Sequence, residues 1–115
     1  MTLEQAKRLK EMGFPQVIGI SAYWELSKGR IELWHTRNLH MCTEICADPT
    51  AEEALEWVIS KINGNYGINI FPGKQLTSIE FYYRETQIQT FLKNTLSDAV
   101  YALIVWAYEN KLLEA

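Results

Sequence analysis

The sequence has 115 residues, of which 48% are hydrophobic and 22% charged, and its net charge is −3 at neutral pH. This balance is typical of a globular protein and argues against a disordered chain and against an integral membrane protein. The acidic balance gives no general attraction to phosphate backbones, so nucleic acid would have to bind at a local basic patch. We expect one domain, residues 1–115.

The first residues, 1–12, are polar and follow a helical pattern, without the apolar core of a signal peptide. The uncharged run from Ala99 to Tyr108 is much shorter than the about 20 apolar residues needed to cross a bilayer. We therefore expect a cytoplasmic protein without membrane contact, in which Cys42 and Cys46 stay reduced.

Three segments share the pattern Thr, two residues, an acid or amide, then Ala: Thr2–Ala6, Thr50–Ala54 and Thr95–Ala99. In each, the threonine hydroxyl can accept an amide hydrogen bond at the start of a helix. The side chain three positions later can in turn accept the amide hydrogen bond of the threonine. The similar spacing of these three helix starts raises the idea of a duplicated unit.

The first predicted helix ends at Met12, because Gly13 can adopt a left-handed conformation and Pro15 prevents continuation. Its apolar stripe is narrow, so we expect it at the edge of the fold. Alternation of apolar and polar residues then predicts strands at 17–26, 30–36 and 39–47, the first two joined in a hairpin by Ser27-Lys28-Gly29.

Apolar residues at helical spacing predict a second helix, which begins at the Thr50 cap and stops at Asn63. Further strands are predicted at 66–71, 75–83 and 86–92, with Pro72-Gly73 as a turn. The last helix, from Thr95 to Lys111, is apolar on every side over its middle, so we expect it to be the centre of the core, with Trp106 as its largest anchor.

The predicted order is α-βββ-α-βββ-α, which indicates an α+β fold with an antiparallel sheet and helices on one face. If the helices cover one face, the other face carries aromatic side chains among mixed charges, which is typical of a protein interface. The candidate interface residues are Tyr23, Arg30, Trp34, Tyr82 and Arg84, accompanied by Glu25, Glu32 and Glu80.

This surface predicts binding of a protein partner or of a second copy of the chain, with a homodimer as the sharper hypothesis. The alternative is that these side chains pack against one another across the strands of a solvated sheet. A second functional alternative is a nucleic-acid-binding accessory protein, because arginines and aromatics on an open sheet can stack on and clamp single strands. The acids on the same face would repel phosphate, so a protein partner is preferred.

Four residues with metal-ligand chemistry occur close together: His35, His40, Cys42 and Cys46. Their spacing lacks the two-residue step with which two cysteines turn toward one zinc ion, and in a strand the two thiols would lie roughly 13 Å apart. We therefore expect packed thiols, and no metal or cofactor. No nucleophile signature or phosphate-binding loop is present, so we expect a protein that is not an enzyme.

Three helix regions carry a further set of motifs: Thr2–Lys7 with Gly13-Phe14-Pro15, 47–50 with 53–57, and Thr95–Val100 with 104–106 and 109–111. In these regions the sequence resembles a family of small uncharacterised proteins from phage and prophage regions of gut bacteria. Asp48, where an alanine is expected, and Val58, where a leucine is usual, depart from the pattern. The resemblance implies the fold and a phage origin, and it implies no active site.

Overall fold

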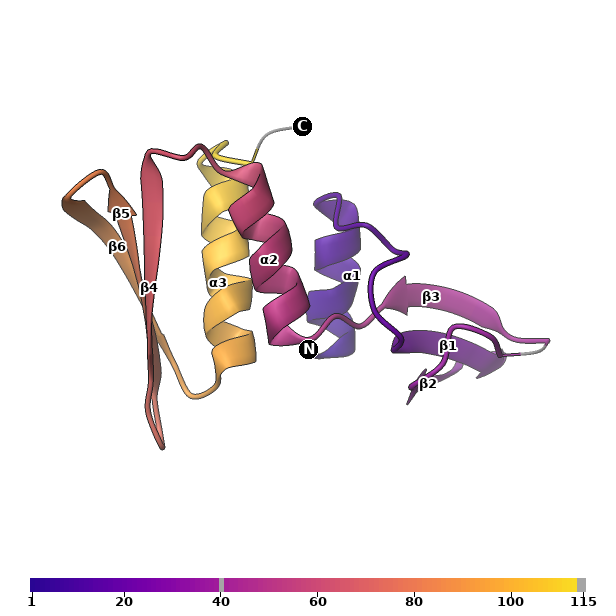
Figure 1. The fold of residues 1–115 in the computed structure, drawn as a ribbon. Helices are drawn as coiled ribbons and strands as arrows, with labels where there is room; N and C mark the ends of the chain where they lie inside the picture. The colour runs from indigo at the N-terminus through magenta and orange to yellow at the C-terminus, as the bar shows by residue number, and fades with distance from the viewer. Residues whose placement is uncertain (40, 114–115) are drawn as a thin grey trace. The chain divides into compact units, whose positions relative to one another are not determined.

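A computed structural model describes residues 1–39 and 41–113, and within them the chain forms helices and strands in the predicted order (Figure 1). The α+β class with antiparallel strands is therefore confirmed. The chain divides into two compact units, Met1–Glu53 and Ala54–Ala115. Within the described residues, no helix is both long and apolar enough to cross a membrane.

The first unit contains α1 (Leu3–Glu11), β1 (Ala22–Ser27), β2 (Arg30–Trp34) and β3 (Thr43–Ala47). Helix α2 (Ala51–Lys61) begins at the end of this unit and continues into the second. The second unit also contains β4 (Tyr66–Pro72), β5 (Thr77–Tyr83), β6 (Thr86–Lys93) and α3 (Leu96–Glu109).

The helices start where the threonines predict. The Thr2 hydroxyl accepts the Gln5 amide at 3.1 Å, and the Gln5 side-chain oxygen accepts the Thr2 amide at 3.0 Å. Thr50 and Glu53 make the same reciprocal pair at the start of α2, and Thr95 caps α3. These bonds satisfy amides that have no partner within the helix, which is why the cap pattern could be read locally.

Helix α1 also ends as predicted. Gly13 has a φ of +98°, and the Phe14 amide donates to the Leu9 carbonyl at 2.9 Å. This closure places the Phe14 ring in the core, where it is 2% exposed.

The first sheet has the strand order β2-β1-β3, with antiparallel pairing throughout and α1 packed on β3. The Lys10 ammonium ties the two by donating to the Ile45 carbonyl at 2.8 Å. The predicted start of the first strand at residue 17 is wrong, because β1 begins only at Ala22.

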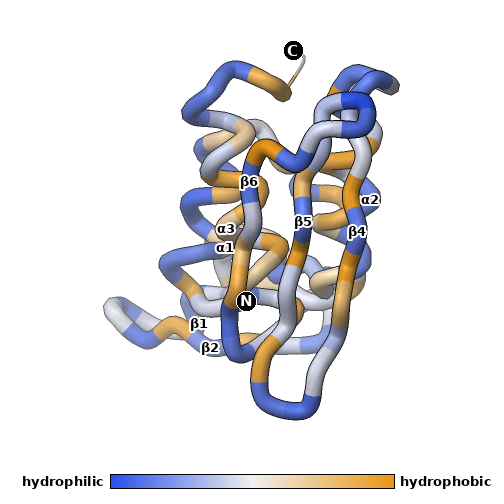
Figure 2. The backbone as a smooth tube through the Cα atoms, turned by 90° about the vertical axis from the view of Figure 1, so that its left-hand side faces the viewer, coloured by the Kyte–Doolittle hydropathy of each residue, from blue (hydrophilic) through white to orange (hydrophobic). Residues whose placement is uncertain are grey.

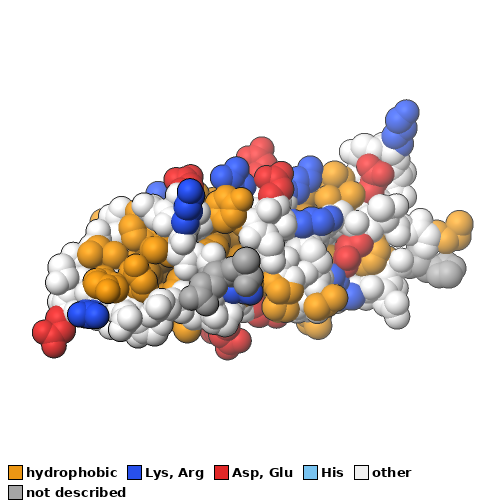
Figure 3. Space-filling view, turned by 90° about the horizontal axis from the view of Figure 1, so that it is seen from above, with side chains coloured by type: hydrophobic (Ala, Val, Ile, Leu, Met, Phe, Trp, Pro, Cys, Tyr) orange, Lys and Arg blue, Asp and Glu red, His pale blue; other side chains and the backbone are white. Residues whose placement is uncertain are grey.

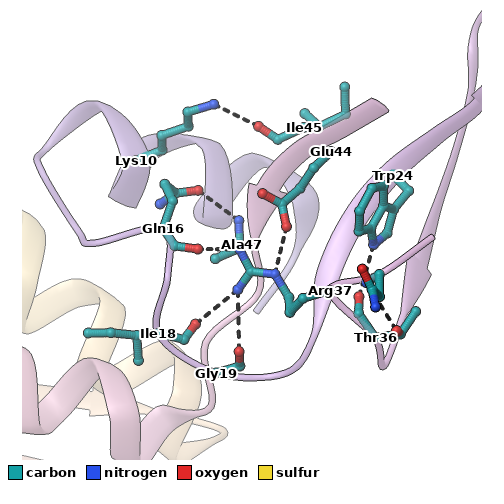
Figure 4. A network of polar contacts seen from close by, with 11 residues as sticks. Lys10, Gln16, Ile18, Gly19, Trp24, Thr36, Arg37, Glu44, Ile45 and Ala47 are labelled. Carbon is teal, nitrogen blue, oxygen red and sulfur yellow. Dashed lines mark hydrogen bonds and ion pairs between the residues drawn. The ribbon is translucent and has the colours of Figure 1, made fainter. Parts of the chain in front are cut away.

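The segment before β1 is instead folded around one side chain, that of Arg37 (Figure 4). Its guanidinium donates to the carbonyls of Gln16, Ile18 and Gly19, and it pairs with Glu44 at 2.6 Å. Successive carbonyls of a strand point in opposite directions, whereas those of Ile18 and Gly19 both point at the Arg37 guanidinium, so these residues form a loop.

The third strand is also shorter than predicted, since β3 begins at Thr43 rather than at residue 39. Met41 has a φ of 59°, which lies in the left-handed region and is incompatible with an extended strand.

The second sheet has the order β4-β5-β6, and α2 and α3 lie on one of its faces (Figures 1 and 2). Burial alternates along β5, where Ile79 and Phe81 are 0% exposed. Phe81 stacks on Tyr66, with ring centroids 5.3 Å apart, and meets Trp106 edge-on at 5.2 Å. The core of this unit therefore lies between the sheet and α3. Trp106, which was predicted as its largest anchor, is half-buried and contributes through its edge-on contact with Phe81.

Helix α3 is not covered on every side. Its buried residues form one stripe, and Tyr108 is 45% exposed. The buried residues of α3 are Ala99, Val100, Leu103, Ile104 and Ala107.

The two groups of strands do not support the idea of a duplicated unit. The middle strand of the first sheet is β1, the first of its group, whereas the middle strand of the second is β5, the second of its group. The repeated order of elements is therefore not accompanied by a repeated sheet topology.

Candidate interaction surfaces

One face of the second sheet points away from α3, and we call it the open face. Because directly paired residues of antiparallel strands point to the same side, the pairing of Ser78 with Phe71 and Leu92 places all three on this face, opposite to buried Ile79 and Phe81. The open face comprises Gly67, Asn69, Phe71, Ser78, Glu80, Tyr82, Gln87, Thr90 and Leu92. Figure 2 shows β6, β5 and β4 with this face toward the viewer.

The polar part of the open face is internally bonded. The Tyr82 hydroxyl donates to the Glu80 carboxylate at 2.8 Å, and this bond raises the pKa of Tyr82 above its ordinary value. The Gln87 amide donates to the Thr90 hydroxyl. Burial of these groups under a partner therefore leaves fewer polar atoms without a hydrogen bond than burial of unbonded groups would.

The other part of the open face is apolar. Phe71 and Leu92 flank Ser78 in one row across the three strands, and they are 54% and 57% exposed. Leu76, which comes just before β5 and continues its alternation, is 48% exposed. We call Phe71, Leu76 and Leu92 the apolar end of the open face. None of these three residues was among the predicted interface residues. Phe71 and Leu92 occupy the polar positions of the strand alternation, and that signal could have revealed them.

The prediction that Arg84 lies on the same face as Tyr82 is wrong. Arg84 has a φ of 57° in the turn after β5, and its guanidinium lies 5.4 Å from the ring centre of Tyr83. Tyr83 pairs with Tyr66, so its ring belongs to the helix-facing side of the sheet. A left-handed residue at a strand end turns the chain and breaks the alternation on which the prediction depended.

The prediction that Tyr23 and Trp34 share a face is also wrong. Tyr23 pairs with Leu33, and Trp34 pairs with Ala22, so the two aromatic side chains lie on opposite faces of the first sheet. The cause is a β-bulge between Glu25 and Ser27, because one additional residue in one strand reverses the side of every later partner.

Tyr23 is held within the first unit instead of forming an open surface. Its hydroxyl donates to the Met1 carbonyl at 2.6 Å. Burial raises the pKa of Tyr23, and the negative charges of Asp48 and Cys46 raise it further.

Arg30, Glu32 and Trp34 do lie together, in a row along one side of β2. The Arg30 guanidinium pairs with Glu32 at 2.6 Å, and the Trp34 indole N–H donates to the same carboxylate at 3.3 Å. Strand β2 has β1 as its neighbour and is an edge of the sheet. The five candidate residues are thus divided among a row on β2, the opposite face of the first sheet, the open face and a turn.

Hydrophobic side chains also gather at the end of the second unit where β4 begins and α3 ends (Figure 3). Tyr83, Ile88 and Tyr108, near this end, are each between 39% and 45% exposed. This group borders the aromatic core of the unit, so we interpret it as the solvent-exposed edge of that core.

The residues considered for metal binding are not brought together. Within 1–39 and 41–113, no three His, Cys, Asp or Glu side chains are placed to hold an ion, and His40 lies outside the described residues. Cys46 is buried and Cys42 is half-buried, both as free thiols, as the sequence predicted. The His35 Nδ1 instead lies 2.7 Å from the Ser21 hydroxyl on the surface.

Comparison with protein-family models, with curated proteins and with solved structures finds no match to this chain.

Proposed function

We propose that this chain is a non-enzymatic interaction protein that binds a protein partner, or a second copy of itself, through the open face of its second sheet. The observation that carries the proposal is the apolar end, where Phe71 and Leu92 are more than half exposed on a sheet face that no helix among the described residues of this unit covers. A bonded polar area beside an exposed apolar one is the usual composition of an interface.

The size of the open face predicts weak binding. Three strands about 4.8 Å apart and about seven residues long span roughly 14 by 23 Å. This is smaller than the roughly 800 Å² that each partner of a standard stable complex buries, so we expect a transient association with a micromolar or weaker dissociation constant.

A protein partner fits this face better than a nucleic acid does. None of the nine residues of the open face is basic, and its one charge is the Glu80 carboxylate. Arg84 lies in the turn over Tyr83, and Arg30 is paired with Glu32. Phosphate contacts supply most of non-specific nucleic-acid affinity, so this arrangement gives such a ligand little attraction.

The further placement of the protein as a cytoplasmic, prophage-encoded accessory factor belongs to the same proposal. It is supported by the resemblance of the segments around Thr2, Thr50 and Thr95 to phage-associated proteins.

The test compares the immobilised chain with two variants in a lysate of its natural host. The double variant Phe71→Glu, Leu92→Glu should lose the retained proteins, whereas the control Ile59→Glu should keep them, because Ile59 is exposed to a similar extent but lies on α2. Retention of the same proteins by all three chains would refute the proposal. Loss of binding after nuclease treatment would instead favour nucleic acid.

A further inference from the structure

The edge strand β2 carries a charge pattern that is complementary to itself. Arg30 and Glu32 lie two residues apart on one side of the strand, with Ile31 between them on the other side. An edge strand presents amide and carbonyl groups that can pair with another strand. These two features together specify a partner strand of the same sequence running in the opposite direction.

Twofold symmetry restricts how two such strands can pair. An axis perpendicular to the sheet makes each face continuous across both copies, so Arg30, Glu32 and Trp34 can lie opposite only residues on the same side of the partner chain. An axis at Glu32 places two carboxylates opposite each other, and an axis at Arg30 places two guanidinium groups opposite each other. Only an axis at Ile31 places Arg30 of each copy opposite Glu32 of the other.

We propose that two copies of this chain associate through antiparallel β2–β2 pairing centred on Ile31, with Arg30 and Glu32 exchanging partners between the copies. The Lys28–Gly29 turn of each copy then lies beside Trp34 of the other, where a lysine ammonium can lie over the indole ring. Trp34 is 42% exposed and Leu33 is 41% exposed in the single chain, so both have surface to bury.

The Arg30–Glu32 ion pairs contribute mainly to the specificity of this dimerisation. In the single chain, Arg30 already pairs with Glu32, and the two side chains are 67% and 34% exposed. Exchange of one exposed ion pair for another changes the affinity little, whereas like charges opposite each other exclude the wrong registers. The affinity comes from the main-chain hydrogen bonds and from the burial of Ile31, Leu33 and Trp34.

The first experiment measures the molar mass by sedimentation equilibrium from micromolar concentrations up to about 1 mM. Arg30→Glu and Glu32→Arg should each weaken dimerisation roughly tenfold or more, because each places two like-charged pairs across the axis. The double variant Arg30→Glu, Glu32→Arg should restore the wild-type dissociation constant to within about threefold. Glu85→Arg, which makes the same charge change as Glu32→Arg on a turn of the second unit, is the control and should behave as wild type.

The second experiment reads the register. In a chain with Cys42→Ser and Cys46→Ser, Ile31→Cys should form a disulfide-linked dimer on mild oxidation with copper–phenanthroline, because residues on the axis have Cβ atoms about 5 Å apart. Leu33→Cys, which the pairing places opposite Gly29, should not. Circular dichroism establishes that each variant is folded before it is scored.

Three outcomes would overturn the proposal: a wild-type chain that remains monomeric at the highest concentration, a double charge variant as weak as the single ones, or equal cross-linking at Ile31→Cys and Leu33→Cys. The proposal is independent of the proposed function, because none of these changes touches the open face. A dimer that is abolished by Phe71→Glu and not by Arg30→Glu would assign self-association to the open face instead.

Discussion

Replacement of Arg37 by alanine removes the side chain around which the loop before β1 is folded. The Arg37 guanidinium donates to three backbone carbonyls, and it pairs with Glu44 at 2.6 Å. Gln16, one of the residues it holds, in turn accepts the Ala47 amide at 2.7 Å and so fastens the loop to β3. The substitution therefore affects both the loop and the adjacent edge of the first sheet.

The expected cost follows from these bonds. The bonds from Nη1 to Ile18 and Gly19 share one nitrogen at 3.3 Å each, so they count as one weak bond beside those to Gln16 and Glu44. At about 1 kcal/mol net for each, and with the side chain only 24% exposed, Arg37→Ala should lower the free energy of unfolding of the first unit by about 3 kcal/mol. Arg30→Ala removes a guanidinium whose ion pair is far more exposed, and it should cost less than about 1 kcal/mol.

Urea denaturation followed by circular dichroism measures both values, and hydrogen exchange locates the change. The Ala47 amide should exchange faster in Arg37→Ala and at the wild-type rate in Arg30→Ala, because Gln16 loses its position only in the first variant. Equal losses of stability in the two variants, or unchanged protection of Ala47, would refute the view that this guanidinium determines the loop.

Two further predictions concern a turn and a thiol. A Cβ atom at Gly73 would lie 2.4 Å from the Leu76 carbonyl oxygen, so Gly73→Ala should lower the melting temperature. Gly64→Ala is the control, because its Cβ atom would meet no atom within 4 Å, and it should leave the melting temperature nearly unchanged. Thermal denaturation that ranks the two variants in the opposite order would contradict the turn geometry. Burial raises the pKa of the Cys46 thiol in the folded chain, so its contribution to stability is complete below the unfolded value near 9.0 and is lost as the pH rises through the folded pKa. The decline in unfolding free energy above pH 9 should therefore be smaller in Cys46→Ala than in wild type. Cys42→Ala, which removes the half-buried thiol, is the control. Equal declines in all three chains would contradict a role of the buried Cys46 thiol in this pH dependence.

The helices could be read from the sequence because their signals are local. A threonine cap and its partner three residues later, such as Thr2 with Gln5, satisfy amides of the same turn whatever surrounds them. The end of α1 at Gly13 and Phe14 is equally local. Alternation likewise identified the strands of the second sheet almost to the residue, because one face of that sheet is buried and the pattern has period two.

The errors arose where distant residues or single irregularities decide the structure. Residues 17–21 alternate like a strand, yet the guanidinium of Arg37, far along the chain, takes carbonyls of this segment and leaves it as a loop. The division of the strands into two sheets likewise depends on pairing between strands, which alternation within one strand does not encode.

The candidate site was the part least accessible from the sequence. Alternation assigns residues to two sides of a strand, but it does not determine which side of one strand continues as which side of the next. A single bulge after Glu25 places Tyr23 and Trp34 on opposite faces of the first sheet, and the left-handed backbone of Arg84 turns this residue away from the face of Tyr82. The sequence by itself determined the elements and their order, because these depend on neighbours a few residues apart; only the tertiary structure decided which side chains share a surface, because that depends on register, which one residue can reverse.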